Sequence, residues 1–302
     1  MNNKRRLFST LLCVAALTAG LFVSGCGSDK AGGIGSVVSS VVDGGSDEKA
    51  AAKLNTLIDA TNRFNGDNAT WGQNYADSLA KLKGGFQEGA IGRQPHYDTL
   101  KDALEKSKKE GSTFKEVDTE RDNVLNILNE LVPTFKDLKA YDDSKAYMND
   151  GGAKGKELAA KYVAQVEKFD AAYAKFNDAL NKANTEQTKK QIEKLKKDGK
   201  KGYAAAMEST LRLTNLVENV EKAPKNADKQ AVEKELNEIQ TLLKSINNDR
   251  GEVLVNSYNS VVGSVRQVLN DANENNLNDM IENFNNYIES YNNTTPDQFD
   301  SK

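Results

Sequence analysis

Cysteine is nearly absent from the chain: two occur in 302 residues, and Cys13 lies in an apolar stretch near the N-terminus. Beyond that stretch only Cys26 remains. A single cysteine excludes an internal disulfide framework, and it cannot supply the thiolates of a structural zinc site. A domain of this size must therefore be stable through its apolar core alone.

Histidine is equally scarce, because His96 is the only one. One histidine without a nucleophile motif does not make a catalytic triad, and without cysteines or a patterned acidic cluster it does not make a zinc site. G-x-S-x-G, P-loop and G-x-G-x-x-G motifs are also missing. We interpret His96 as a solvated loop residue, and we expect no catalytic residues, no metal and no cofactor.

Proline occurs four times, and alternating runs of β-branched residues are rare. Between residues 50 and 293 the chain is instead rich in Ala, Leu, Lys, Glu, Asn and Asp, which is a helical composition. We therefore expect an all-α fold, an elongated antiparallel bundle of about seven to nine helices.

An excess of basic charge is also missing. Without the three basic residues at positions 4–6, the chain has 38 Lys and Arg against 44 Asp and Glu, a net charge of −6. Both signs are interspersed, so the chain offers no basic face for nucleic acid and no charged face for an anionic lipid surface.

The N-terminus carries the most informative pattern. The basic triplet at residues 4–6 precedes an apolar run at residues 7–23, the order found in a secretory signal peptide. The run ends in Val-Ser-Gly-Cys at residues 23–26, which resembles a bacterial lipobox. The resemblance implies cleavage between Gly25 and Cys26, acylation of the Cys26 thiol, and anchoring in membrane lipid.

The segment has two other interpretations. About 18 apolar residues can span a bilayer, so residues 7–23 could be an uncleaved anchor. Ser9, Thr10, Thr18 and the small residues at its end favour cleavage instead. Cys26 could be an ordinary buried cysteine, but it lies between glycines in a polar stretch.

The composition divides the chain into four segments. Residues 1–25 are the predicted cleaved leader, and residues 26–46 are the lipidated cysteine followed by a Gly- and Ser-rich tether with a reach of roughly 25 Å. Residues 47–293 are predicted to form one helical domain, and residues 294–302 a disordered tail.

The strongest helical periodicity lies in residues 158–180. Apolar and aromatic residues recur there every three or four positions, at Leu158, Tyr162, Val166, Phe169, Tyr173, Phe176 and Leu180. Such a seam is typical of the core face of a long helix in a bundle. The alternative is that its aromatic residues line a ligand groove.

One turn could carry cation chemistry. Residues 141–150 hold Asp142, Asp143 and Asp150 together with two tyrosines. The spacing is not that of an EF-hand, and we favour acidic helix caps in a solvated turn over a cation site.

The same region resembles a known family. Residues 141–150 (YDDSKAYMND) and 153–158 (AKGKEL) are similar to the centre of the YiiG-type bacterial lipoproteins, whose shared domain has no known function. Similarity also covers residues 53–65 and 195–203, spans most of residues 50–222, and continues more weakly to the end. Gly151, Gly152 and Ala159 stand where bulkier residues and a histidine are expected. The resemblance implies an exported, lipid-anchored helical domain and no activity.

Together these features predict a membrane-anchored, extracytoplasmic lipoprotein that is not an enzyme. It would lie at the bacterial cell membrane or outer membrane, held by lipid through Cys26, and would bind an envelope protein or a cell-wall polymer. The alternative is a ligand- or solute-binding lipoprotein with a pocket inside the bundle. A hydrolase acting through carboxylates ranks last.

Overall fold

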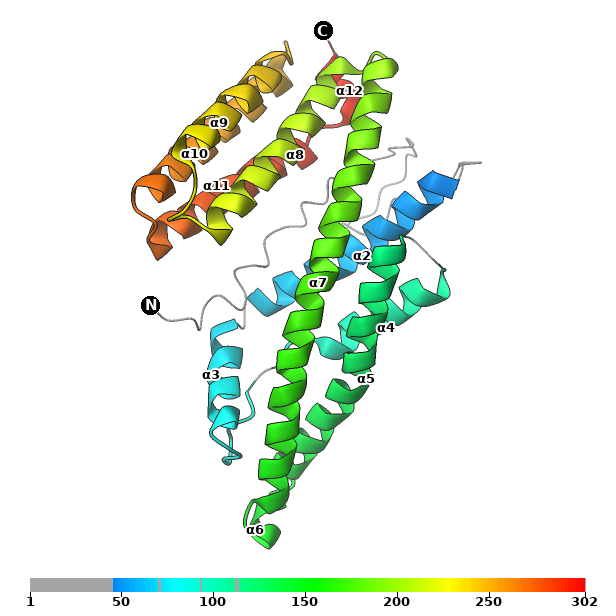
Figure 1. Cartoon of the computed structure of the whole chain (residues 1–302), viewed down its shortest axis with the longest axis vertical. Coiled ribbons are helices and arrows are strands. Elements are labelled where there is room, and N and C mark those ends of the chain that lie inside the picture. Colours follow the sequence, from blue (N-terminus) through cyan, green and yellow to red (C-terminus); the bar gives the residue numbers. More distant parts are fainter. Residues whose placement is uncertain (1–45, 70–71, 93, 112–113, 302) are drawn as a thin grey trace. The chain divides into compact units, whose positions relative to one another are not determined.

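The computed structural model describes residues 46–69, 72–92, 94–111 and 114–301. These residues form eleven α-helices and no β-strand (Figure 1). Nine of the helices have 12 to 45 residues, while α6 and α12 have only four and five. The prediction of an all-α helical bundle is confirmed. Within the described ranges, every helix is too short or too polar to span a lipid bilayer.

The described residues divide into two compact units, one ending at Ala183 and the other beginning at Asn184. The sequence predicted one helical domain over residues 47–293. The division falls inside one long helix, α7 (Ala153–Lys197), whose first part belongs to unit 1 and whose last part belongs to unit 2.

Unit 1 packs the first part of α7 with four longer helices and one short helix. These are α2 (Ser46–Ala69), α3 (Gly72–Lys83), α4 (Tyr97–Lys109), α5 (Lys115–Asp143) and α6 (Tyr147–Asp150). Helix α4 packs against both α2 and α5. The loop between α3 and α4 is held to α3 by Ser78, whose Oγ donates to the Ala90 carbonyl at 2.7 Å and accepts from the Gly92 N–H at 2.9 Å.

Unit 2 consists of the end of α7 and five further helices. These are α8 (Lys201–Lys222), α9 (Lys229–Lys244), α10 (Asp249–Asn270), α11 (Glu274–Asn292) and α12 (Pro296–Asp300). Short connections make α9, α10 and α11 successive antiparallel neighbours. Each begins with a side-chain cap, from Asp228, Asn248 and Asn273 respectively, which satisfies free N–H groups of the first turn.

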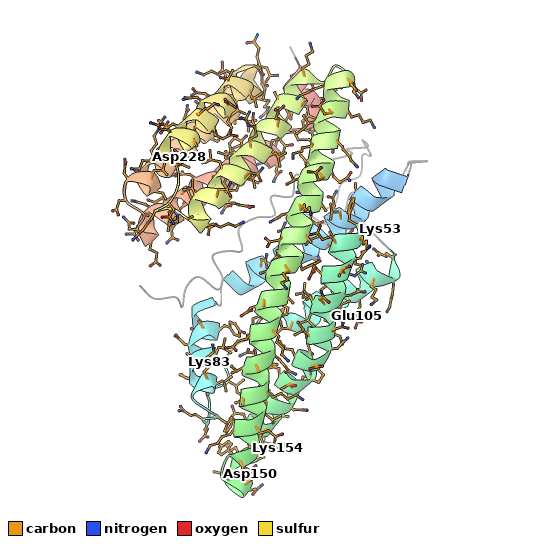
Figure 2. All side chains as sticks on the ribbon, in the orientation of Figure 1. Lys53, Lys83, Glu105, Asp150, Lys154 and Asp228 are labelled. Carbon is orange, nitrogen blue, oxygen red and sulfur yellow. The ribbon has the colours of Figure 1, made fainter. Side chains whose placement is uncertain are left out.

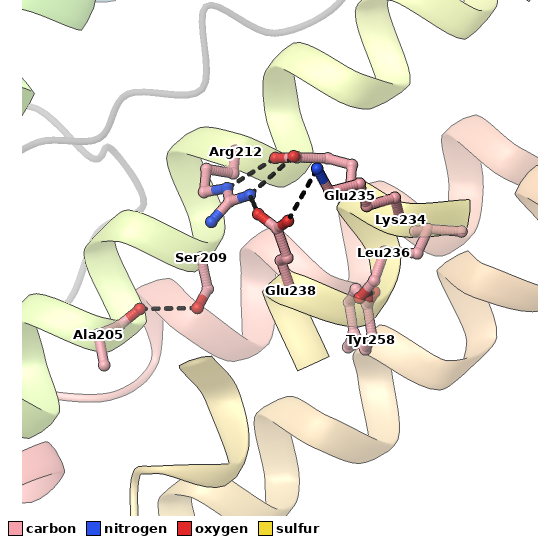
Figure 3. A network of polar contacts seen from close by, with 8 residues as sticks. All are labelled: Ala205, Ser209, Arg212, Lys234, Glu235, Leu236, Glu238 and Tyr258. Atoms are coloured by element: carbon pink, nitrogen blue, oxygen red, sulfur yellow. Dashed lines mark hydrogen bonds and ion pairs between the residues drawn. The ribbon is translucent and has the colours of Figure 1, made fainter. Parts of the chain in front are cut away.

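Ion pairs on the outside of unit 2 join neighbouring helices. Arg212 on α8 makes a bidentate contact with Glu235 on α9, at 2.6 and 2.7 Å, and also donates to Glu238 (Figure 3). Below this network, the hydroxyl of Tyr258 on α10 donates to the Leu236 carbonyl at 2.5 Å. The planar guanidinium matches a carboxylate in two places, so Arg212 fixes the register of α8 against α9.

The C-terminal tail differs from its prediction as a disordered segment. Residues 296–300 form α12, and Phe299 is only 2% exposed. The segment carries no periodic pattern of its own, so its order comes from contacts with unit 2. One aromatic side chain and several backbone hydrogen bonds to distant residues hold it in place.

Candidate functional site

The lipidation and cleavage residues predicted from the sequence, Cys26 and Gly25, lie outside the described residues. The candidate site that the structure describes is a cluster of buried tyrosines in unit 1, built around the seam of α7. Tyr162, Phe169, Tyr173 and Phe176 are all buried there.

Aromatic rings from neighbouring helices fill the space against this seam. The ring of Phe169 lies 5.9 Å from that of Phe64 on α2 and 4.9 Å from that of Tyr97 on α4, both in edge contacts. Tyr173 stacks on Phe169 at 5.1 Å. Tyr162 lies 5.6 Å from Phe135 on α5. These are the separations of packed aromatic pairs, so the seam is core.

The buried hydroxyls of the cluster bond to one another and to amides. Tyr75 on α3 and Tyr97 on α4 share a hydrogen bond of 2.8 Å. Tyr162 donates to the side-chain oxygen of Gln94, and Tyr173 donates to Asn65 Oδ1 at 2.7 Å. These bonds join α3 to α4, and they join α2 and the loop before α4 to α7.

Burial raises the pKa of Tyr75, Tyr97, Tyr162 and Tyr173 above the ordinary range of tyrosine. An ionised phenolate would lose its hydration inside the bundle, so all four stay protonated at neutral pH. They act as hydrogen-bond donors and acceptors and not as bases.

Asp170 is a carboxyl close enough to this cluster to act electrostatically on Tyr75, Tyr97 and Tyr162. Burial raises its pKa to about 7; Lys83 opposes that rise and Glu167 adds to it. The Lys83 ammonium at the end of α3 contacts the Glu167 carboxylate on α7 at 2.8 Å, in an exposed ion pair. Asp170 can therefore exchange a proton near neutral pH.

Another carboxyl whose pKa is raised to about 7 lies in unit 2. Burial, with a further contribution from Glu218, raises the pKa of Glu221 on α8 to about 7. Each has a glutamate nearby that raises its pKa further, Glu167 for Asp170 and Glu218 for Glu221.

Gln165 lies on α7 directly before the seam residue Val166. Its side chain is 4% exposed, and neither its Oε1 nor its Nε2 has a hydrogen-bond partner in the part of the chain that the structure describes. A buried amide without partners is costly, and a bound water or small polar group would remove that cost.

The sequence did not point to Asp170 or Gln165 as site residues. Both flank the seam, directly after Phe169 and directly before Val166. The sequence does show that each is a polar residue next to a buried stripe. A helical pattern does not show whether another helix packs over the positions beside that stripe, so it could not predict how far these two residues are buried.

The acidic side chains in the turn at residues 141–150 make hydrogen bonds and ion pairs within the protein. Asp150 caps α7 by accepting from the N–H groups of Gly152 at 2.9 Å and Lys154 at 3.2 Å, and it also accepts from the Tyr141 hydroxyl at 2.5 Å. Figure 2 labels Asp150 and Lys154 at this end of α7. The preference for acidic helix caps is thus supported for Asp150.

The other two carboxylates of the turn also have protein partners. Asp143 pairs with Lys139 at 2.8 Å, and Asp142 accepts from the Gly89 N–H at 3.5 Å. A Cβ at Gly155 would lie 2.6 Å from the rings of both Phe86 and Tyr141, so this glycine allows the loop to pack on α7. Across the described ranges, no group of three His, Cys, Asp or Glu residues could hold a metal ion.

His96 begins α4 as its N-cap residue and is half-buried. Its carbonyl accepts from the Leu100 N–H at 3.1 Å. The large hydrophobic side chains exposed on the described surface are Met148, at 74%, and Val253.

Comparison with known protein families gives a match. A family model described as "Protein of unknown function (DUF3829)" matches residues 48–286. Neither a curated protein nor a solved structure matches the chain. The match covers most of unit 1 and of unit 2, and the chain therefore belongs to the DUF3829 family of proteins of unknown function.

Proposed function

We propose that this protein is a lipid-anchored lipoprotein of the bacterial cell envelope that serves as a non-enzymatic helical binding module. The order of basic, apolar and small residues before Cys26 supports the anchor, and residues 27–46 supply a flexible spacer. Within the DUF3829 family, we place it with the YiiG-type lipoproteins, on the residues that resemble them.

The observation that carries a surface-binding role is the filled interior of unit 1. The aromatic seam, which was the best sequence candidate for a ligand groove, is covered by the protein's own rings at 4.9 to 5.9 Å. A partner of this module would therefore meet its outer faces. The large hydrophobic side chains exposed on the described residues are Met148 and Val253, and so few apolar anchors suit reversible recognition better than permanent burial.

The partner we propose is an envelope protein or a cell-wall polymer on the extracytoplasmic side. Gly27 follows the cysteine, so the sequence has no acidic residue at the position that retains some lipoproteins in the inner membrane. In a cell with two membranes we place the protein on the outer one.

In-cell crosslinking followed by affinity purification tests the binding role. Wild-type protein and a Cys26→Ser variant with an intact leader would be expressed at equal levels in the native host. We expect a crosslinked species from the wild type that the variant loses, because the variant is not held at the membrane. Equal recovery from both, or no species above the control, would contradict a membrane-held binding module.

A ligand inside the bundle is the second candidate, and Gln165 is the observation that favours it. Its buried Nε2, which can donate two hydrogen bonds, and its Oε1, which can accept two, are used by no described residue. A bound polar molecule would satisfy both atoms, as would ordered water.

A further inference from the structure

The end of the chain occupies an aromatic slot in unit 2. Phe299 is 2% exposed and stacks between Tyr203 on α8 and Tyr291 on α11, with ring centres 5.9 Å away on each side and planes inclined by 13° and 26°. A Cβ at Gly202 would overlap the carbonyl group of Phe299. The slot therefore needs a glycine at position 202 to admit the peptide backbone.

Polar groups hold the segment on either side of Phe299. The Asp300 carboxylate accepts from the backbone N–H groups of Gly202 at 2.7 Å and Tyr203 at 3.4 Å. These groups belong to the first turn of α8, where free N–H groups and the helix dipole favour an anion. The Lys200 ammonium contacts the Asp297 carboxylate at 2.8 Å.

One asparagine holds the backbone of the segment. Asn248 Nδ2 donates to the carbonyl groups of Gln298 at 3.1 Å, Phe299 at 3.1 Å and Ser301 at 3.0 Å. Its Oδ1 meanwhile caps α10 through the N–H groups of Arg250 and Gly251. The cap fixes the amide, so Nδ2 is oriented in advance toward three carbonyl groups of a bound chain.

The family model matches most of the residues that form the slot, but it does not match the segment that occupies the slot. Gly202, Tyr203 and Asn248 lie within the matched residues 48–286, whereas the segment 294–301 lies beyond them. Most of the slot therefore belongs to the family domain. Apart from the exposed Lys200–Asp297 pair, its contacts are to backbone carbonyl groups, one aromatic ring and the carboxylate of the next residue. Any peptide with an aromatic residue directly before an acidic residue can present these groups.

We propose that this slot is a peptide-binding site for a partner protein whose segment carries an aromatic residue directly followed by a carboxylate side chain, and that the chain's own C-terminal segment occupies it in cis. The proposal deepens, and rests on, the binding role proposed above. The segment joins α11 through Asn293–Thr295, a short link. Such a link gives a local concentration on the order of millimolar, so a partner must displace the segment in order to bind.

The test measures binding of a fluorescein-labelled peptide of residues 294–302 (TTPDQFDSK) by fluorescence anisotropy. The receptors are the purified mature chain and the same chain with Phe299→Ala and Asp300→Asn, which frees the slot. We expect the variant to bind at least about tenfold more tightly than the wild type. Replacing phenylalanine by alanine in the labelled peptide should weaken binding to the variant by about tenfold or more.

Equal binding of a scrambled peptide, or no binding by a variant that keeps its helical circular dichroism, would overturn the proposal. If the variant does not fold, amide hydrogen exchange of the wild-type chain tests whether the peptide displaces the C-terminal segment. Excess unlabelled peptide should then speed amide exchange in residues 298–301, and unchanged exchange would contradict displacement. Because the purified chain needs no lipid, a negative result would leave the membrane anchor untouched.

Discussion

Gly202 and Phe299 are in such close contact that residue 202 cannot carry a side chain without moving the C-terminal segment. We predict that Gly202→Ala releases the segment and destabilises unit 2 by about 2 kcal/mol, because Phe299 loses its buried environment. Urea unfolding followed by circular dichroism measures the change.

Gly263→Ala is the matched control for this prediction. Gly263 lies within α10, and a Cβ there meets nothing within 4 Å. Alanine should raise the stability by up to about 1 kcal/mol at this site, since it is the better helix former. Equal stabilisation by both substitutions would show that the contact at Gly202 does not matter.

The raised pKa of Asp170 predicts that the free energy of unfolding depends on pH. Its pKa is about 7 in the folded chain against about 3.9 in an unfolded one, so the folded state binds more protons between these values. The contribution of Asp170 to stability therefore falls as the pH rises from about 4 to above 7. The Asp170→Asn variant should not lose this stability at high pH, because asparagine does not ionise.

The gain from Asp170→Asn should be larger at pH 8 than at pH 5, by on the order of 2 kcal/mol. Denaturant unfolding at the two pH values measures the difference. Asp178→Asn, at an exposed carboxylate further along α7, is the control and should show little change between them. A gain from Asp170→Asn that does not depend on pH would contradict the assignment.

Gln165→Met tests whether the buried amide is satisfied by something beyond the protein. The substitution keeps the length of the side chain and removes both partnerless atoms. If the site is dry, we expect stabilisation by about 1 kcal/mol, because an unsatisfied buried polar group is removed. Thermal unfolding gives the answer, and a loss of comparable size would mean that water or a ligand binds there.

The helices were predictable because their signal is local. The spacing of Tyr162, Phe169 and Phe176 places one stripe on one face of α7, and that face is buried. The division between Ala183 and Asn184 has no such signal, since no proline, glycine or change in composition marks it.

The site details depend on residues far apart in the chain. Tyr162 meets Gln94, and Tyr173 meets Asn65. A helical period identifies the buried face but not the partner of each hydroxyl. The C-terminal tail was predicted to be disordered for the same reason, because its order depends on Gly202 and Asn248.

The central claim is that Cys26 anchors this helical module to membrane lipid. Metabolic labelling with an alkyne-tagged palmitate in the native host, with wild type and Cys26→Ser compared by in-gel fluorescence, tests it most directly. The account predicts that the wild type is labelled and recovered with membranes, and that the variant is neither. Equal labelling of the two proteins, or an unlabelled wild type, would contradict it.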